Sequence, residues 1–521
     1  MSFMNKSVLV ILLSLVVYGW NYWGTSIYTL DEAKNAGSAV EMMRRGDPFV
    51  PTFNNDYHDK PALQYLFMVM SYKVFGINPF SARFFSVIFG VLLVLSVFQF
   101  VKKIVNETTA WYTSLILISS LQLAVQFRMA VPDPFLLFFL TFGLLSFYVG
   151  HTEKKSSFLY YFYACLGFGF VAKGPIAFAL PGIVILIFLV LKKDLSIKTI
   201  LSLHIFTGAL LTLVIGLPWY VGVGLVTNWD WLTYFFITHN LERYTSTFEG
   251  HGGFLFDGVV IVFAALLPVS IFLPQTLRDA WRSRKEQPFI LFTLSACLGV
   301  IGFFFFSKTV LPSYVEPCVP FAAILLASFV YKCKSAAFAQ TKKLWINGIV
   351  FCMIGIAMPV AAVIALQIDP ELKDLYLRGL FFVVVPVGAF IALYFLKKDQ
   401  VENAFYTYVI TFITLLILIS SFVLPQVDGK NPVVRSVKMV KDYNRPMAYY
   451  KRINSAYVFQ LGTSIKRLDN EDELNAFVEE NGKVLIISAE EEWSQLKRSD
   501  FTVTFKAKDL FESPISLIAV N

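Results

Sequence analysis

The chain has 521 residues, of which 56% are hydrophobic and only 15% are charged. A soluble domain carries about 25% charged residues, so this composition excludes an ordinary soluble protein and indicates a membrane protein. The formal net charge is +8, but the lysines and arginines lie in short segments between apolar runs, which favours a role in membrane orientation over nucleic-acid binding.

Mostly apolar runs of about 20 residues, long enough to cross a bilayer as a helix, recur from Val8 to near Leu424. The first run starts after Lys6 and is expected to be a retained helix, because no clear small-residue cleavage site follows it. The runs within 158–191 are interrupted by Lys173-Gly174-Pro175 and predict either two full helices or a re-entrant pair. In all, about thirteen transmembrane helices are expected, with centres near Leu15, Gly90, Leu117, Phe139, Phe162, Val184, Leu210, Phe263, Leu298, Ile324, Ile356, Val385 and Leu416.

The loops between these runs alternate in character. One set is short and rich in Lys or Arg, which is typical of cytoplasmic loops: it comprises 102–103, 154–155, 192–193, 278–285, 332–343 and 397–398. The other set contains the long segments, which are expected to face the periplasm. Residues 1–425 are therefore expected to form an all-α polytopic membrane domain with outer loops 30–82 and 218–256.

Charged residues become frequent after Pro425, and residues 426–521 are expected to form a small soluble α/β domain on the periplasmic side. Residues 448–450 and 484–488 are typical of strands, and residues 471–480 of a helix that Asn470 caps. The five cysteines form no CxxC pair, so neither a disulfide framework nor a thiolate metal site is indicated.

The first outer loop begins with Asp31 and Glu32, directly after the first apolar run. A carboxylate at bilayer depth costs about 2.5 to 3.5 kcal/mol on insertion scales, so such acids are rarely without a function. The alternative is that both residues only cap the following helix. Later in this loop come Tyr57, Asp59 and Lys60; Lys60 could bind a lipid phosphate as a point charge, or be an ordinary interfacial lysine.

A second acid, Asp133, follows Arg128 in a very short outer loop, where it faces the same side as Asp31 or caps the next helix. In the loop 218–256, Arg243 could bind a phosphate through two hydrogen bonds. His239 could be a metal ligand, a base or an interfacial hydrogen-bond donor.

A later outer segment adds a cation at Lys308 and a phenol at Tyr314. Two acids and a lysine on one face predict a site that handles charge, without specifying the reaction.

In this order, the segments resemble the GT-C membrane glycosyltransferases, and most of all the branch that holds the aminoarabinose transferases of lipid A and the protein O-mannosyltransferases. The resemblance covers roughly 9–327 and rests on 31–33, 46–63 with Asp59-Lys60-Pro61, 128–133, 173–175, 239–244 and 307–314. The lipid A enzymes commonly have Glu-Lys-Pro-Pro where this chain has Asp59-Lys60-Pro61-Ala62. They often have a His where Thr238 stands, and here His239 follows one position later.

The resemblance implies a polyprenyl-phosphate sugar donor, such as an undecaprenyl-phosphate sugar, and an inverting displacement on the periplasmic face of a bacterial inner membrane. It makes Asp31 the catalytic acid, with Asp133 and Glu32 as further acids. Five residues would bind the donor phosphate or its lipid: Lys60, Arg243, Arg128, Lys308 and Tyr314. Additional site candidates are Asp59, His239 and Tyr57, and a divalent cation, if one is used, would be held by Asp59 and His239.

The expected acceptor is lipid A or lipopolysaccharide, and the alternative within the same fold is a protein hydroxyl. A lipid-linked sugar flippase or transporter is the rival from another class. Transporters place ionisable residues near the bilayer midplane, often between inverted repeats. Here the acids lie at the edges of outer loops and no repeat is visible, which favours an enzyme.

Overall fold

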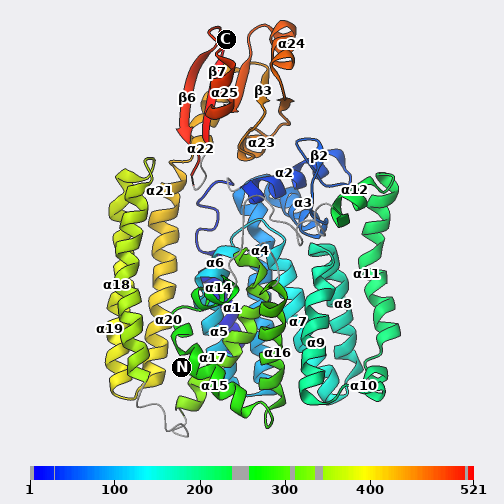
Figure 1. The fold of residues 1–521 in the computed structure, drawn as a ribbon, viewed down its shortest axis with the longest axis vertical. Coiled ribbons are helices and arrows are strands. Elements are labelled where there is room, and N and C mark those ends of the chain that lie inside the picture. Colours follow the sequence, from blue (N-terminus) through cyan, green and yellow to red (C-terminus); the bar gives the residue numbers. More distant parts are fainter. Residues whose placement is uncertain (1–4, 28–29, 238–256, 306–310, 335–343, 511–513) are drawn as a thin grey trace.

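The computed structural model describes residues 5–27, 30–237, 257–305, 311–334, 344–510 and 514–521, with backbone only for Leu30 and Asp257. Long helices stand side by side, and a small domain with a β-sheet lies at one end of the bundle (Figure 1). The helices of the first half are α1 (Lys6–Gly19), α4 (Pro79–Ile104), α5 (Glu107–Ser119), α6 (Leu121–Gln126), α7 (Asp133–Glu153), α8 (Ser156–Lys173), α9 (Ile176–Lys192), α10 (Ile197–Ser202) and α11 (Ile205–Val226).

The second half of the bundle contains longer helices and several short 3-10 or π segments. These are α14 (Asp257–Ala265), η2 (Val269–Phe272), α15 (Leu273–Ser283), α16 (Pro288–Phe305), η3 (Pro312–Tyr314), η4 (Glu316–Cys318), α17 (Val319–Lys334), α18 (Leu344–Ile368), η6 (Lys373–Val383), α19 (Val384–Lys397), α20 (Val401–Leu418), η7 (Ile419–Val423) and α21 (Leu424–Asp428).

The polytopic membrane fold expected from the sequence is confirmed. Within the described ranges, eight helical segments are long and apolar enough to cross a membrane, or nine if the pair Gly258–Ala265 and Val269–Ser283, bent by 118°, is one span. Each expected centre lies in a helix, while the number of spans stays a prediction. The interrupted pair consists of two separate helices, α8 and α9, that meet at Gly174.

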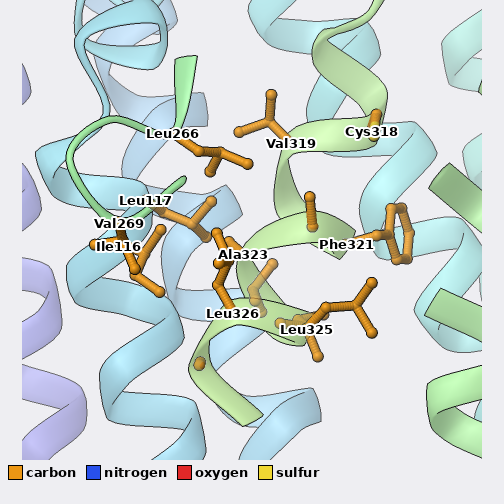
Figure 2. Close-up of a cluster of buried hydrophobic side chains, with 14 of the residues drawn as sticks. Ile116, Leu117, Leu266, Val269, Cys318, Val319, Phe321, Ala323, Leu325 and Leu326 are labelled. Atoms are coloured by element: carbon orange, nitrogen blue, oxygen red, sulfur yellow. The ribbon is translucent and has the colours of Figure 1, made fainter. Parts of the chain in front are cut away.

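The centre of the bundle is held together by apolar side chains on α17. Figure 2 shows Phe321, Ala323 and Leu326 of α17 in a cluster with Leu117 of α5 and with Leu266. The span that contains α17 is 83% buried, whereas α18 at the edge is 22% buried and presents its apolar surface to lipid. The segment that leads into α17 is therefore anchored in the core.

A layer of short elements covers the end of the bundle that carries the small domain (Figure 1). It contains α2 (Leu30–Arg45), the strand pair β1 (Thr52–Phe53) and β2 (Asp56–Tyr57), α3 (Leu63–Phe75) and α12 (Asp230–Thr233). One apolar cluster runs from this layer into the small domain, and it includes Tyr65, Trp231 and Tyr457. The outer loops and the C-terminal domain therefore pack together.

The C-terminal domain is a five-stranded mixed sheet with four helices. The strand order is β4-β3-β5-β7-β6, in which β3 runs parallel to β4 and β5, while β7 is antiparallel to β5 and β6. The strands are β3 (Met447–Tyr450), β4 (Lys466–Leu468), β5 (Leu485–Ala489), β6 (Thr502–Lys508) and β7 (Ile515–Val520), and the helices are α22 (Pro432–Tyr443), α23 (Ala456–Leu461), α24 (Glu471–Asn481) and α25 (Glu490–Leu496).

Three sequence predictions for this domain are confirmed. The two expected strands are β3 and β5, and the expected helix is α24. Asn470 caps that helix, since its Oδ1 accepts a hydrogen bond of 3.0 Å from the Glu473 N–H.

Direct hydrogen bonds attach the C-terminal domain to the outer layer. Asn54, in the β1–β2 turn, donates from Nδ2 to the Ile465 carbonyl at 3.0 Å and accepts from the Ile465 N–H at 2.7 Å. Near the membrane, Asp428 accepts from the N–H and the hydroxyl of Ser26 at 2.8 and 2.6 Å. The domain is thereby fixed over the end of the bundle.

Candidate active site

A cavity of about 310 Å³ lies at this end of the bundle, among α2, the 58–60 loop, α7, α8, α9, α16 and the segment before α17. Its volume falls in the range of about 300 to 1,000 Å³ that is usual for ligand sites. Its charged and polar lining is Asp31, Asn35, Asp59, Lys60, Asp133, Lys173, Ser313 and Tyr314, and its apolar lining includes Leu136, Ile176, Ala179, Leu180, Phe303 and Phe304. It therefore offers charged groups beside an apolar wall.

The first turn of α2 places Asp31 in this cavity. Asp31 and Glu32 both lie in that turn, where the helix dipole favours negative charge. Successive residues of a helix point about 100° apart, so the two side chains diverge: Asp31 is exposed and lines the cavity, and Glu32 is buried. Asn35 lies one turn after Asp31 on the same face and lines the same cavity.

Glu32 belongs to a buried ion pair and does not line the cavity. Arg83 of α4 donates to it from Nε at 2.6 Å and from Nη2 at 2.8 Å, and its side chain is 4% exposed against 2% for Glu32. Arg83 also donates to the carbonyls of Tyr22 and Ser26, at 2.7 and 2.8 Å. Glu32 further accepts from the Ala130 N–H at 2.9 Å. The structure therefore places Glu32 in a support that fixes the start of α2.

Asn35 joins α2 to α3 and to the loop before it. Its Oδ1 accepts from Gln64 Nε2 at 3.0 Å and from the Tyr65 hydroxyl at 2.9 Å. Burial raises the pKa of Tyr65, so its hydroxyl stays protonated and able to donate. The same oxygen lies 3.1 Å from His58 Nε2. This junction holds Asp31 opposite the loop that carries Lys60.

Asp59 lies between Lys60 and His58. Its Oδ2 is 2.8 Å from Lys60 Nζ, and its Oδ1 is 3.3 Å from His58 Nδ1. Burial lowers the pKa of His58 to about 4, against the opposing effect of Asp59. His58 is thus neutral at neutral pH, and Lys60 supplies the positive charge beside Asp59.

A second charged pair lines the cavity where α7 and α8 meet. Lys173 Nζ is 2.5 Å from Asp133 Oδ1, and it lies 5.6 Å from the centre of the Tyr314 ring. Asp31, by contrast, has no cation within ion-pair distance in the described part of the chain. Asp31 is therefore the cavity carboxylate that remains available to accept a proton or a hydrogen bond.

The break between α8 and α9 positions Lys173. Gly174 has φ = +83°, a backbone conformation that side chains disfavour, and a Cβ there would lie 2.6 Å from Cζ of Phe235. Phe235 also lines the cavity. The Lys173-Gly174-Pro175 segment thus ends one helix, starts the next and leaves a lysine at the cavity.

The structure brings together five of the predicted site residues, namely Asp31, Asp59, Lys60, Asp133 and Tyr314. Besides Glu32, it places two others elsewhere. Arg128 donates to the carbonyls of Tyr18 and Val17 and to the Ser420 hydroxyl. Tyr57 lies exposed on β2. His239, Arg243 and Lys308 lie outside the described residues.

Three charged or amide residues near the cavity were not among the predicted site residues. Asn35 and Lys173 line it, and Glu316 lies behind it, next to the lining residue Pro317. Glu316 is 1% exposed and accepts from Gln122 Nε2 at 2.7 Å. The interruption at Lys173 was visible in the sequence, whereas the other two sit in helical contexts with no distinguishing local signal.

No group of three or more His, Cys, Asp or Glu side chains within the described ranges could hold a metal ion. The cation ligands expected from the sequence were Asp59, which already contacts Lys60 and His58, and His239, which falls outside those ranges.

The chain is similar in sequence to known sugar transferases. Residues 8–234 match the family described as dolichyl-phosphate-mannose-protein mannosyltransferase. The undecaprenyl phosphate-alpha-4-amino-4-deoxy-L-arabinose arabinosyl transferases of Yersinia pestis and Yersinia pseudotuberculosis are 28% identical over 420 residues, which is 77% of this chain and 74% of theirs.

The fold is also that of solved structures. ArnT from Cupriavidus metallidurans bound to undecaprenyl phosphate superposes with a TM-score of 0.82 over 98% of this chain and 97% of that one, at 19% identity. An oligosaccharyltransferase of Archaeoglobus fulgidus gives a TM-score of 0.54 at 12% identity, over 93% of this chain and 69% of that one. These similarities support a membrane glycosyltransferase, and the fold is that of the solved ArnT structure.

Proposed function

We propose that the chain transfers a sugar from an undecaprenyl-phosphate carrier to lipid A at the periplasmic face of a bacterial inner membrane. The supporting observation is the composition of the cavity, where Asp31 lies with two lysines against an apolar wall. The names of the similar arabinosyl transferases support the donor. An aminopentose of the kind those names contain is the proposed sugar.

The lysines neutralise the leaving group. In the displacement, the bond between the sugar C1 and the carrier phosphate oxygen breaks, and the negative charge on that phosphate grows. Lys60 and Lys173 bind this phosphate as point charges, and fixed charges of this kind usually give the largest single contribution to catalysis. Asp59 and Asp133 hold the two ammonium groups in place before the donor binds.

Asp31 acts on the acceptor. An acceptor hydroxyl loses its proton to the Asp31 carboxylate as its oxygen bonds to C1, while an acceptor phosphate is only oriented by it. General base catalysis contributes about 10²- to 10⁴-fold. The apolar wall formed by α9 and α16 holds the first isoprene units of the carrier, which keeps C1 next to Asp31.

The basic ends of the helices support the orientation. Lys102 and Lys103 end α4, Lys192 ends α9 and Lys397 ends α19, all away from the end that carries the cavity. Positive charge is concentrated on the cytoplasmic side of membrane proteins. The cavity and the C-terminal domain are thus assigned to the periplasm.

The test is the transfer rate of Asp31→Asn, measured with purified enzyme and a labelled undecaprenyl-phosphate aminopentose and followed in cells by mass spectrometry of lipid A. We expect a loss of at least about 100-fold where the acceptor is a hydroxyl, because the amide accepts no proton. Asp56→Asn is the matched control, since Asp56 is exposed on β2 outside the cavity. A folded Asp31→Asn enzyme with a wild-type rate would refute the assignment.

A further inference from the structure

A second cavity, of about 450 Å³, lies at the opposite end of the bundle and is called the inner cavity here. Two helices line both cavities: α7 contributes Asp133 to the first and Tyr148 to the second, and α16 contributes Phe304 and Phe289. At 1.5 Å per residue, the α7 segment between the two positions is about 22 Å long. The inner cavity therefore faces the membrane leaflet opposite the active site.

The inner cavity offers polar groups to a ligand. Thr109 is fully buried there, and its hydroxyl has no hydrogen-bond partner among the described residues. Buried hydroxyls normally have a partner, so this one can serve a ligand in the cavity. Lys332 also lines the cavity, with its Nζ 2.6 Å from Asp279 Oδ2 and its side chain 26% exposed. The other polar residues of the lining are Asn106, Tyr148, Gln287, Ser328 and Tyr331.

The inner cavity also has an apolar lining. It includes Ile104 and Val105, where α4 ends, and Phe289 and Ile290 at the start of α16. A lining with both polar and apolar residues suits an amphiphile, whose head group lies at the membrane boundary and whose chains run along the helices.

A basic amphipathic helix borders the inner cavity. Helix α15 packs against α16 and α17, and its Asp279 is the residue that contacts Lys332. Its outer surface exposes Leu277 and Trp281, at 45% and 48%, together with Arg278 and Arg282. Apolar and aromatic residues next to arginines are typical of a helix that lies in the interface and attracts anionic lipids.

The charges around the inner cavity are mainly positive. The Arg284 guanidinium lies 3.8 Å from the centre of the Trp281 ring, and Lys102 ends α4 nearby. Acids among the described residues of this region include Glu107, which pairs with Lys102 at 3.4 Å, Asp279, which contacts Lys332, and Glu286 after α15. They also include Glu402, which accepts from Tyr112 at 2.6 Å and from Lys334 at 3.0 Å.

We propose that the inner cavity binds the phosphate head group of an anionic phospholipid from the leaflet opposite the active site. Lys332, Asn106 and the Thr109 hydroxyl contact the phosphate, and the acyl chains lie along the apolar lining. The arginines of α15 concentrate anionic lipid at the entrance. This binding site is separate from the sugar-transfer cavity and does not depend on the transfer reaction.

The test measures lipid binding and thermal unfolding of the delipidated full chain in neutral detergent. Phosphatidylglycerol, phosphatidylcholine or inorganic phosphate is added, and bound lipid is counted by native mass spectrometry. Phosphatidylglycerol is expected to bind and to raise the Tm of the wild type, and the other two are not. Lys332→Gln should weaken phosphatidylglycerol binding about fivefold, the equivalent of about 1 kcal/mol for one cationic residue. Lys438→Gln, on α22 of the C-terminal domain, is the matched control and should bind like the wild type.

Val105→Trp provides a second variant, because it fills the inner cavity from a half-exposed position and leaves the Lys332–Asp279 pair intact. It should abolish the phosphatidylglycerol-dependent rise in Tm while unfolding like the wild type in phosphatidylcholine. An undiminished rise in this variant would overturn the proposal, whatever Lys332→Gln does. An equal rise with inorganic phosphate alone would identify a free anion as the ligand and also overturn it.

Discussion

Arg83→Leu tests the support beneath the active site. The change leaves the Glu32 carboxylate buried at 2% exposure with one remaining hydrogen bond, from the Ala130 N–H. Removing one partner of a buried ion pair costs about 3 to 5 kcal/mol, because the other charge is left without compensation. The carbonyls of Tyr22 and Ser26 lose their donor as well. Since native proteins are stable by only about 5 to 15 kcal/mol, we expect a large fraction of the stability to be lost.

The assay measures the free energy of unfolding by reversible unfolding in mixed micelles, for Arg83→Leu, Glu32→Leu and the double variant. The double variant should be more stable than the sum of the single effects predicts, because it leaves no unpaired buried charge. Strict additivity, or an Arg83→Leu protein within about 1 kcal/mol of wild type, would refute the reasoning. A double variant that folds but transfers no sugar would return Glu32 to the catalytic residues.

Two further predictions concern the parts that hold the cavity together. Gly174→Ala should lower stability by about 1 to 3 kcal/mol and slow sugar transfer. The backbone at residue 174 has φ = +83°, which a side chain disfavours, and the added Cβ would push the Phe235 ring away. Thermal unfolding and transfer rates check this against Gly182→Ala, whose Cβ meets no atom within 4 Å and should be neutral or stabilising; equal effects would contradict it. Asn54→Ala removes two hydrogen bonds to Ile465 and should weaken docking of the C-terminal domain by about 1 to 3 kcal/mol, seen as faster limited proteolysis near α21. Asn55→Ala, also at positive φ, keeps those bonds and should be cut at the wild-type rate; equal cleavage of the two variants would argue against this role.

The membrane fold was predictable because hydropathy acts over whole helices. A run of apolar residues has to be a helix in lipid, since every backbone polar group needs an internal partner there. The expected centres therefore fall in helices even where the ends differ. In the C-terminal domain, the apolar runs of β3 and β5 were recognised, whereas β6 and β7 at the other edge of the sheet were not.

The charged part of the cavity was predictable from the order of short motifs, and the roles of neighbouring residues were not. Asp31 and Glu32 look alike in the sequence, and only the direction of each side chain from α2 separates a cavity residue from a buried support. The partner of Glu32 is Arg83, 51 residues away. Asn35 and Glu316 likewise depend on contacts from distant segments, which local patterns do not encode.

The attachment of Asn54 next to β4 has a consequence for the edge of the sheet. β4 is an outermost strand, and the edge of a sheet carries unpaired N–H and C=O groups that can recruit a strand from another molecule. Asn54 occupies both backbone groups of Ile465, immediately before β4, so the membrane part of the chain shields this border. A fragment that begins at α22 lacks the contact with Asn54, so the edge of its sheet at β4 is exposed. Separate fragments would associate through this exposed edge.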